Sequence, residues 1–101
     1  MMVAMVEVSD VPDESRYVVT VDGAVAGFLS YRLQGDQFIA VHTEIDPAYG
    51  GQGLGGTLVQ QVLDNVRDDG LRLLPLCPFV KGFLAKHPEY SDLVDRNGGA
   101  A

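Results

Sequence analysis

The sequence predicts a single α/β domain in which an antiparallel meander is followed by a β-α-β unit and a C-terminal helix. Three observations lead to this class. Strand-like runs separated by turn signals fill the first half of the chain. An amphipathic helical pattern then begins behind a glycine-rich segment. A short apolar run follows that helix, and the element order β-β-β-α-β-α results.

The meander is predicted from three runs rich in β-branched and aromatic residues. A polar turn over residues 10–14 precedes the first predicted strand, Arg16–Val21. Asp22-Gly23 is a hairpin signal, because a type I′ turn needs positive φ at both of its central residues. The chain returns as Ala24–Leu33 and then as Gln37–Ile45, which completes the meander.

The β-α-β unit is predicted from the second half of the chain. Apolar side chains recur at helical spacing from Leu54 to Val66, and Gly70 ends this helix. The apolar run 71–77 is a buried strand, which the crossover helix makes parallel to the third strand. Pro78 opens a last helix to about residue 86. The domain is expected to span residues 1–101, with its core at about 3–94 and a frayed tail at 96–101.

Composition narrows the class of protein. The chain has 101 residues, of which 47% are hydrophobic, and Cys77 is its single cysteine, so no disulfide can form within it. The first ten residues hold no basic side chain and too short an apolar stretch for a signal peptide, so we expect a cytoplasmic protein. Fourteen acids against seven bases give a net charge of −7, which disfavours nucleic acid and suits a cationic partner or an amine, or serves solubility alone. We expect neither a metal nor a membrane partner.

The glycine-rich segment predicts an anion site. Five of the seven residues from Gly50 to Gly56 are glycine, and no Ser, Thr, Asp or Asn lies between Pro47 and Thr57 to cap the helix. Bare amides at a helix start bind a phosphate or pyrophosphate, although a tight loop without a ligand has the same glycines. The match to G-x-G-x-x-G lacks the strand context of a dinucleotide site, and a Walker loop would need a lysine before Thr57.

Three segments together resemble a known family. "VHTEIDP", "GQGLGGTLV" and "PLCPFVKGFLAKHPEY", in this order and spacing, are similar to the small single-domain members of the GNAT superfamily of N-acetyltransferases, and the resemblance covers roughly residues 16–94. The acyl-CoA loop of that superfamily reads Arg/Gln-x-x-Gly-x-Gly/Ala. Gly53 and Gly55 match its glycines, whereas its first position falls on Gly50, so that side chain is absent.

The resemblance implies a compact GNAT-like fold and an acetyl-CoA-dependent transfer of an acetyl group to an amine. The two parallel strands would splay apart, and pantetheine would lie between them. The acceptor would be a small molecule, a peptide or a protein lysine. The residues implied in binding coenzyme A are Glu44, Ile45, Gly51, Gln52, Gly53, Leu54, Gly55, Gly56, Cys77, Phe79 and Lys81, with Lys86 as a further partner for its 3′-phosphate.

Acetyl transfer to an amine needs a base, and Glu44 is the candidate, acting directly or through water. Strand alternation puts it on one face with His42, and puts Thr43 and Ile45 on the other. A surface carboxylate is the alternative for Glu44, and a structural histidine for His42. Larger superfamily members place a tyrosine acid in the last helix, where this chain has Phe83-Leu84, and Tyr90 is the nearest substitute.

Cys77 is the second candidate catalytic residue. It precedes Pro78 at the start of the last helix, where the helix dipole favours a thiolate. Three roles are open to it: nucleophile that accepts the acetyl group, lining of the thioester pocket, or small buried hydrophobe.

Two functions other than acetyl transfer are also possible for the chain as a whole. They are a non-catalytic acyl-CoA-binding module and a domain that binds a different phosphoryl ligand.

Overall fold

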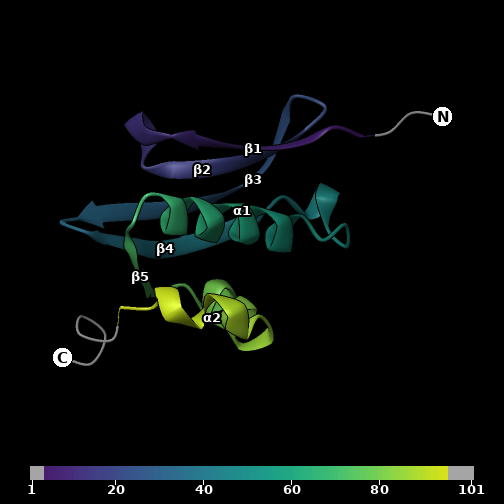
Figure 1. Ribbon diagram of the computed structural model, residues 1–101. Coiled ribbons are helices and arrows are strands. Elements are labelled where there is room, and N and C mark those ends of the chain that lie inside the picture. Colours follow the sequence, from purple (N-terminus) through teal and green to yellow (C-terminus); the bar gives the residue numbers. More distant parts are fainter. Residues whose placement is uncertain (1–3, 96–101) are drawn as a thin grey trace.

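The computed structural model describes residues 4–95 as a five-stranded sheet with two α-helices (Figure 1). The strands are β1 (Val6–Val11), β2 (Arg16–Val21), β3 (Ala24–Gln34), β4 (Gln37–Ile45) and β5 (Arg72–Pro75), and the helices are α1 (Leu54–Asp68) and α2 (Pro78–Lys86). The strand order is β1-β2-β3-β4-β5, antiparallel except for the parallel β4–β5 pair. The predicted α/β class is therefore confirmed. Residues 1–3 and the predicted tail at 96–101 lie outside the described part.

One strand was missing from the prediction. β1 pairs with β2 from Val6↔Val21 to Val11↔Arg16, so the predicted polar turn over 10–14 is wrong at its start, and only Pro12–Glu14 forms a turn, of the 3₁₀ type. β1 is an edge strand with mostly exposed side chains, and Val8 is its residue packed against the core. Backbone pairing holds such a strand, so its sequence needs little apolar alternation.

The β2–β3 hairpin follows the prediction. Asp22 has φ +50° and Gly23 has φ +85°, as a type I′ turn requires. The Asp22 carboxylate also accepts a hydrogen bond from the Met5 backbone N–H at 2.9 Å. The turn therefore fixes the hairpin and ties the start of β1 to it.

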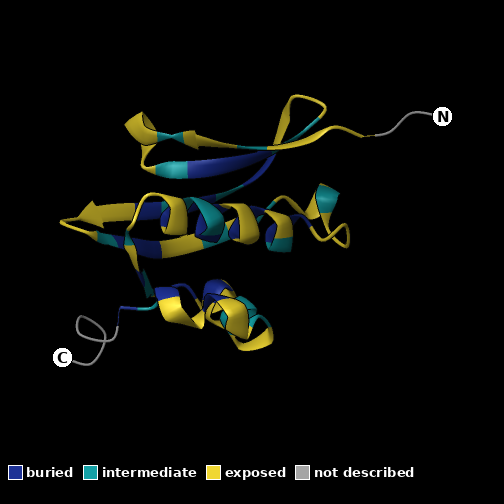
Figure 2. Cartoon of the chain, viewed as in Figure 1, coloured by how far each residue is buried: buried dark blue, intermediate teal, exposed yellow. Residues whose placement is uncertain are grey.

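α1 covers the sheet with the predicted apolar stripe (Figures 1 and 2). All six of its predicted positions are at most 5% exposed: Leu54, Leu58, Val59, Val62, Leu63 and Val66. Each such burial contributes about 1.5–3 kcal/mol. Val80 of α2 belongs to the same core cluster, together with Phe38 of β4 and Leu73 of β5. One core therefore joins both helices to the sheet.

The parallel strands separate halfway along β4, as the resemblance implied. Their pairing runs from Gln37↔Arg72 to Ala40↔Pro75. The Ala40 carbonyl then accepts from the N–H groups of both Leu76 and Cys77, at 3.0 and 3.1 Å, and the chain turns into α2. β4 continues to residue 45, and no described strand pairs with this edge of it beyond Ala40.

A bulge in β4 changes which side chains face the core. β3 pairs Ser30 with His42 and the next residue, Tyr31, with Ala40, so Val41 has no residue opposite it. Before the bulge, the even-numbered Ala40 is buried; after it, the odd-numbered Thr43 and Ile45 point to that side. The bulge therefore reverses the alternation along the last part of the strand.

Candidate functional site

The segment between β4 and α1 is a short turn followed by glycines in unusual backbone conformations. The turn Pro47–Tyr49 is capped by Asp46, whose Oδ1 accepts from the Ala48 N–H at 2.9 Å. Gly51 has φ +81° and Gly53 has φ +73°, both in the left-handed region that favours glycine. The sequence therefore needs glycine at these two positions for backbone reasons alone.

The start of α1 offers bare backbone donors. Gly53 is its N-cap, and within residues 4–95 no side chain makes a capping hydrogen bond there. The first hydrogen bond of the helix runs from the Thr57 N–H to the Gly53 carbonyl at 3.1 Å. The amides of residues 54–56 precede it and have no acceptor within the helix. Three aligned donors and the positive end of the helix dipole therefore suit an anion, and the anion site expected from the sequence stays a prediction.

The first turn of α2 packs directly on this helix start. A Cβ added at Gly55 would lie 2.5 Å from Cζ of Phe79, so any side chain at position 55 would displace the ring. Beside this contact lies a hollow of about 350 Å³ whose lining includes Gly56, Phe79 and Lys86. Lys81 is exposed on α2 and does not line the hollow, so Lys86 is the lysine placed beside the glycine loop.

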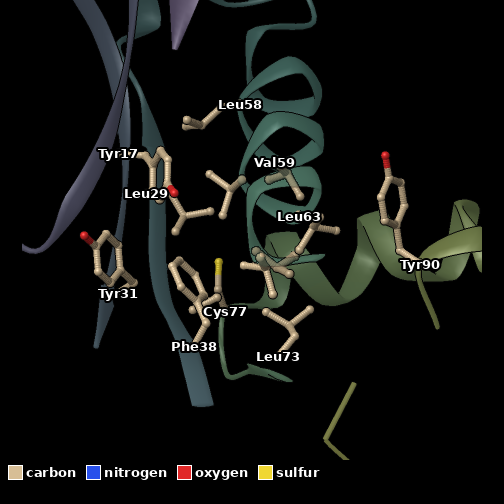
Figure 3. Packing of buried hydrophobic residues seen from close by; sticks show 14 of the residues in the cluster. Tyr17, Leu29, Tyr31, Phe38, Leu58, Val59, Leu63, Leu73, Cys77 and Tyr90 are labelled. Carbon is tan, nitrogen blue, oxygen red and sulfur yellow. The ribbon is translucent and has the colours of Figure 1, made fainter. Parts of the chain in front are cut away.

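Cys77 is the N-cap of α2 and is only 2% exposed. Its Sγ donates to the Thr43 hydroxyl at 3.4 Å. Figure 3 shows the sulfur pointing into the core beside Phe38. The thiol is therefore buried, and it forms a hydrogen bond to a hydroxyl group. Its role as a nucleophile stays a prediction.

Glu44 lies on the opposite face of β4. Its side chain and that of His42 are exposed, whereas Thr43 contacts Cys77 and Ile45 packs against the core, which confirms the predicted alternation. The two candidate catalytic side chains, Glu44 and Cys77, are therefore on different faces of the same strand. His42 packs its ring against Phe28, with ring centroids 6.0 Å apart.

Glu44 lines a cavity that the sequence did not reveal. The cavity measures about 330 Å³, lies where β3 and β4 run side by side, and includes Phe28 and Asp46 in its lining. Phe28 lies within the predicted strand Ala24–Leu33 and Asp46 follows the predicted strand Gln37–Ile45, and nothing in the sequence marks either as a site residue. Their proximity depends on the β3–β4 register, in which Phe28 lies opposite Glu44, and no local pattern encodes it.

Tyr90 is far from the glycine loop. Its hydroxyl donates to Oδ1 of Asp64 at 2.7 Å. That hydrogen bond, together with burial, raises the pKa of Tyr90. Asp64 lies ten residues after Leu54, which is about 15 Å along the axis of α1. The structure therefore gives Tyr90 a packing role beside the far end of α1 and separates it from the site.

The part of the chain that the structure describes contains neither a cluster of metal ligands nor a membrane-spanning helix. No group of three or more His, Cys, Asp or Glu side chains gathers there in a metal-binding arrangement. None of the helices between residues 4 and 95 is long and apolar enough to cross a membrane.

Comparison with known proteins adds independent information. The family profile described as GCN5-related N-acetyl-transferase matches residues 16–93. The solution structure of a GCN5-like protein from Staphylococcus aureus, a proposed N-acetyltransferase, is similar with a TM-score of 0.69 and 25% identity, over 88% of this chain and 87% of that one. No curated protein matches the sequence significantly.

Two larger proteins share part of the fold. The ribosomal-protein-S18-alanine N-acetyltransferase of Escherichia coli is 26% identical with a TM-score of 0.57, over 59% of this chain and 39% of that one. A proposed acetyltransferase of the GNAT family from Desulfovibrio desulfuricans has a TM-score of 0.53 at 20% identity, over 76% and 51% of the two chains. The last similarity concerns the fold alone.

Proposed function

The chain belongs to the GCN5-related N-acetyltransferase family, whose profile matches residues 16–93, and from this premise we propose that it transfers an acetyl group from acetyl-CoA to an amine. The chain is an enzyme of the N-acetyltransferase class. One observation above all supports acetyl-CoA as the donor: the uncapped first turn of α1 follows directly on the unpaired edge of β4. The cytoplasmic location expected from the composition stays a prediction.

The described residues fit coenzyme A in three places. The edge of β4 around Glu44 and Ile45 has backbone groups for pantetheine, which would complete the sheet like a strand. The amides of residues 51–56 suit the pyrophosphate. The hollow beside Phe79 and Lys86 has an aromatic wall and a positive charge for the nucleotide end, and exposed Lys81 lies on the same helix. Acetyl-CoA supplies the activated acetyl thioester.

We assign proton removal to Glu44. An alkylamine with pKa of about 10.4 is protonated at neutral pH and must lose a proton before its nitrogen attacks. In the transfer a nitrogen–carbon bond forms and the carbon–sulfur bond of the thioester breaks, while one proton leaves the amine and one is taken up by the thiolate. Glu44 is exposed, lines a cavity open to an acceptor, and lies on the strand that flanks the proposed pantetheine site.

For Cys77 we propose that it lines the acetyl site and does not carry the acetyl group. A nucleophilic cysteine is activated by an adjacent base or by a helix N-terminus, and its sulfur must be able to reach the thioester. The thiol of Cys77 donates to the Thr43 hydroxyl, which is not a base, and the side chain is only 2% exposed. These two observations support direct transfer from the thioester to the amine.

Two measurements test the proposal. Calorimetry with coenzyme A and with ADP should give clearly tighter binding of coenzyme A, because ADP cannot fill the β4 edge. An assay of acetyl-CoA against a panel of primary amines should give amine-dependent release of the free thiol. Binding of coenzyme A without turnover of any amine would instead indicate a binding module, and equal affinity for ADP would indicate a different phosphoryl ligand.

A further inference from the structure

The cavity beside Glu44 has a lining that is partly acidic and partly apolar. It measures about 330 Å³, which is room for a small molecule or the end of a long side chain. Its lining contains two carboxylates, Glu44 and Asp46, and no basic side chain. The walls between them are apolar, with Phe28 on β3 and Pro47 after β4. Such a cavity combines an apolar middle with two negatively charged groups.

The second carboxylate is held in a fixed position. The Asp46 N–H donates to the Ala26 carbonyl at 2.8 Å, which ties the residue to β3. Its Oδ1 accepts from the Ala48 N–H at 2.9 Å, so the side chain is also fixed. One oxygen is used in this way, and the negative charge remains. A preorganised charge of this kind binds a cation without a further ordering cost.

The backbone spacing of the two acidic residues suggests a length. Glu44 and Asp46 are two residues apart along extended backbone, so their Cα atoms are about 6.6–6.8 Å apart, and both residues line the same cavity. An alkane diamine with four or five methylenes has its two nitrogens about 6–7.5 Å apart, given carbon–carbon bonds of about 1.5 Å. The length of such a molecule matches the Cα spacing, and rotation of the exposed Glu44 side chain adjusts the distance between the two carboxylates.

The charged groups around the cavity do not neutralise its two carboxylates. The Arg16 guanidinium lies 5.0 Å from the centroid of the Phe28 ring. It is paired with Glu14 at 2.8 Å, so its charge is already balanced. His42 lies on the same face of β4, 6.0 Å from the Phe28 ring centroid. The lining itself therefore keeps an excess of two negative charges.

We propose that this cavity is the acceptor site and that it selects an acceptor with two positive charges, an α,ω-diamine of four or five methylenes. Glu44 takes the proton from the amine that is acetylated, and Asp46 holds the second amine as an ammonium ion. Phe28 and Pro47 contact the methylenes between them. The inference rests on the proposed function for the identity of the reaction, whereas the selection of a dication rests on the cavity alone.

The first test measures binding. Calorimetry at about 0.15 M salt, where charges more than ~8 Å apart are largely screened, compares 1,5-diaminopentane with hexylamine, which replaces one ammonium by a methyl group. The diamine should bind about fivefold tighter or more, as expected for one additional partly exposed ion pair. Asp46→Asn should abolish the difference, because asparagine can still accept from Ala48 but carries no charge.

Asp36→Asn is the matched control for net charge, because Asp36 is exposed in the turn at the opposite end of β4. It should leave the preference for the diamine intact. Equal binding of the two amines by the wild-type protein would overturn the inference, and so would an undiminished preference in Asp46→Asn.

The second test separates this inference from the proposed function. With acetyl-CoA, the kcat/KM for the diamine should exceed that for hexylamine by a similar factor. If both amines are acetylated equally well, transfer is supported and dication selection is wrong. If the diamine binds in an Asp46-dependent manner and no amine is acetylated, the cavity is a dication site and the proposed transfer is wrong.

Discussion

Cys77 combines several structural roles in one side chain. It begins α2, it packs in the core, and it donates to Thr43. These structural roles are sufficient to explain why a small, weakly polar residue occupies position 77, without any covalent role in the reaction. The alternative is that Cys77 acts as a nucleophile, since a helix N-terminus stabilises a thiolate.

Replacing Cys77 by alanine should separate these roles. We expect Cys77→Ala to lower the free energy of unfolding by about 1 kcal/mol, because it removes one buried heavy atom. Turnover should fall less than tenfold if transfer is direct. Mass spectrometry of the wild-type chain after incubation with acetyl-CoA alone should show no acetylated Cys77. Complete loss of activity together with an acetylated cysteine would establish the covalent route.

The assignment of Glu44 as base predicts a large effect from a small change. Glu44→Gln keeps the size of the side chain and removes its ability to take a proton. Turnover should fall by roughly 10²–10⁴, with little change in affinity for acetyl-CoA. Glu7→Gln, an equal charge change on the exposed edge strand, is the control and should behave like the wild type. Normal turnover in Glu44→Gln would exclude the role.

The two ends of α1 have the same backbone geometry and different proposed functions. Both ends use a glycine in the left-handed region, Gly53 at φ +73° and Gly70 at φ +69°. A Cβ at either position would meet no described atom within 4 Å. The two glycines therefore make equal demands on the backbone, and only Gly53 adjoins the proposed pyrophosphate site.

This pair allows a matched test of the glycine loop. Alanine at either position should destabilise the fold by a similar amount, about 1–2 kcal/mol, because each forces a Cβ into the left-handed region. Gly53→Ala should also weaken binding of coenzyme A by tenfold or more, about 1.4 kcal/mol, while Gly70→Ala should not. Thermal unfolding and calorimetry provide the two readouts. Equal affinities in both variants would remove the loop from the binding site.

The elements also show how far sequence reasoning extends. The helical stripe of α1 and the turn at Asp22-Gly23 were predictable, because each follows from local periodicity or backbone preference. β1 was not, since pairing with β2 holds it and few of its side chains are buried. The cavity containing Asp46 was also out of reach, because it depends on the register between two strands.

At the scale of the whole molecule, three tyrosine hydroxyls join separate elements. Tyr31 of β3 donates to Asp10 of β1 at 2.7 Å, and Tyr90 donates to Asp64 of α1 at the same distance. Tyr17 of β2 accepts from Asn65 of α1 at 3.3 Å. Burial raises the pKa of Tyr17 and, with the hydrogen bond to Asp10, that of Tyr31, and the hydrogen bond to Asp64 raises that of Tyr90.

These shifts predict an alkaline loss of stability. Because the folded pKa values are raised above the unfolded value of about 10, the folded state holds these protons more tightly. Their contribution is fully present below pH ~10 and is lost as the pH rises further. Urea unfolding at pH 8 to 11 should show this decline. Tyr31→Phe should be less stable at pH 8 and lose less on going to pH 11; an unchanged decline would contradict the assignment.

The bulge at Val41 puts one extra residue into the last part of β4. Because Val41 is the residue without an opposite partner, deleting it would remove the bulge, and His42, Thr43 and Glu44 would keep the faces that they have now. Inserting one residue between His42 and Thr43 would instead exchange the two faces, so that the Glu44 carboxylate pointed into the core and the Thr43 hydroxyl toward the acceptor cavity. We expect the insertion to lower turnover and stability far more than the deletion, which assays of acetyl transfer and thermal unfolding of the two variants would show. At this point of the chain, the site tolerates the loss of the extra residue and not the gain of another.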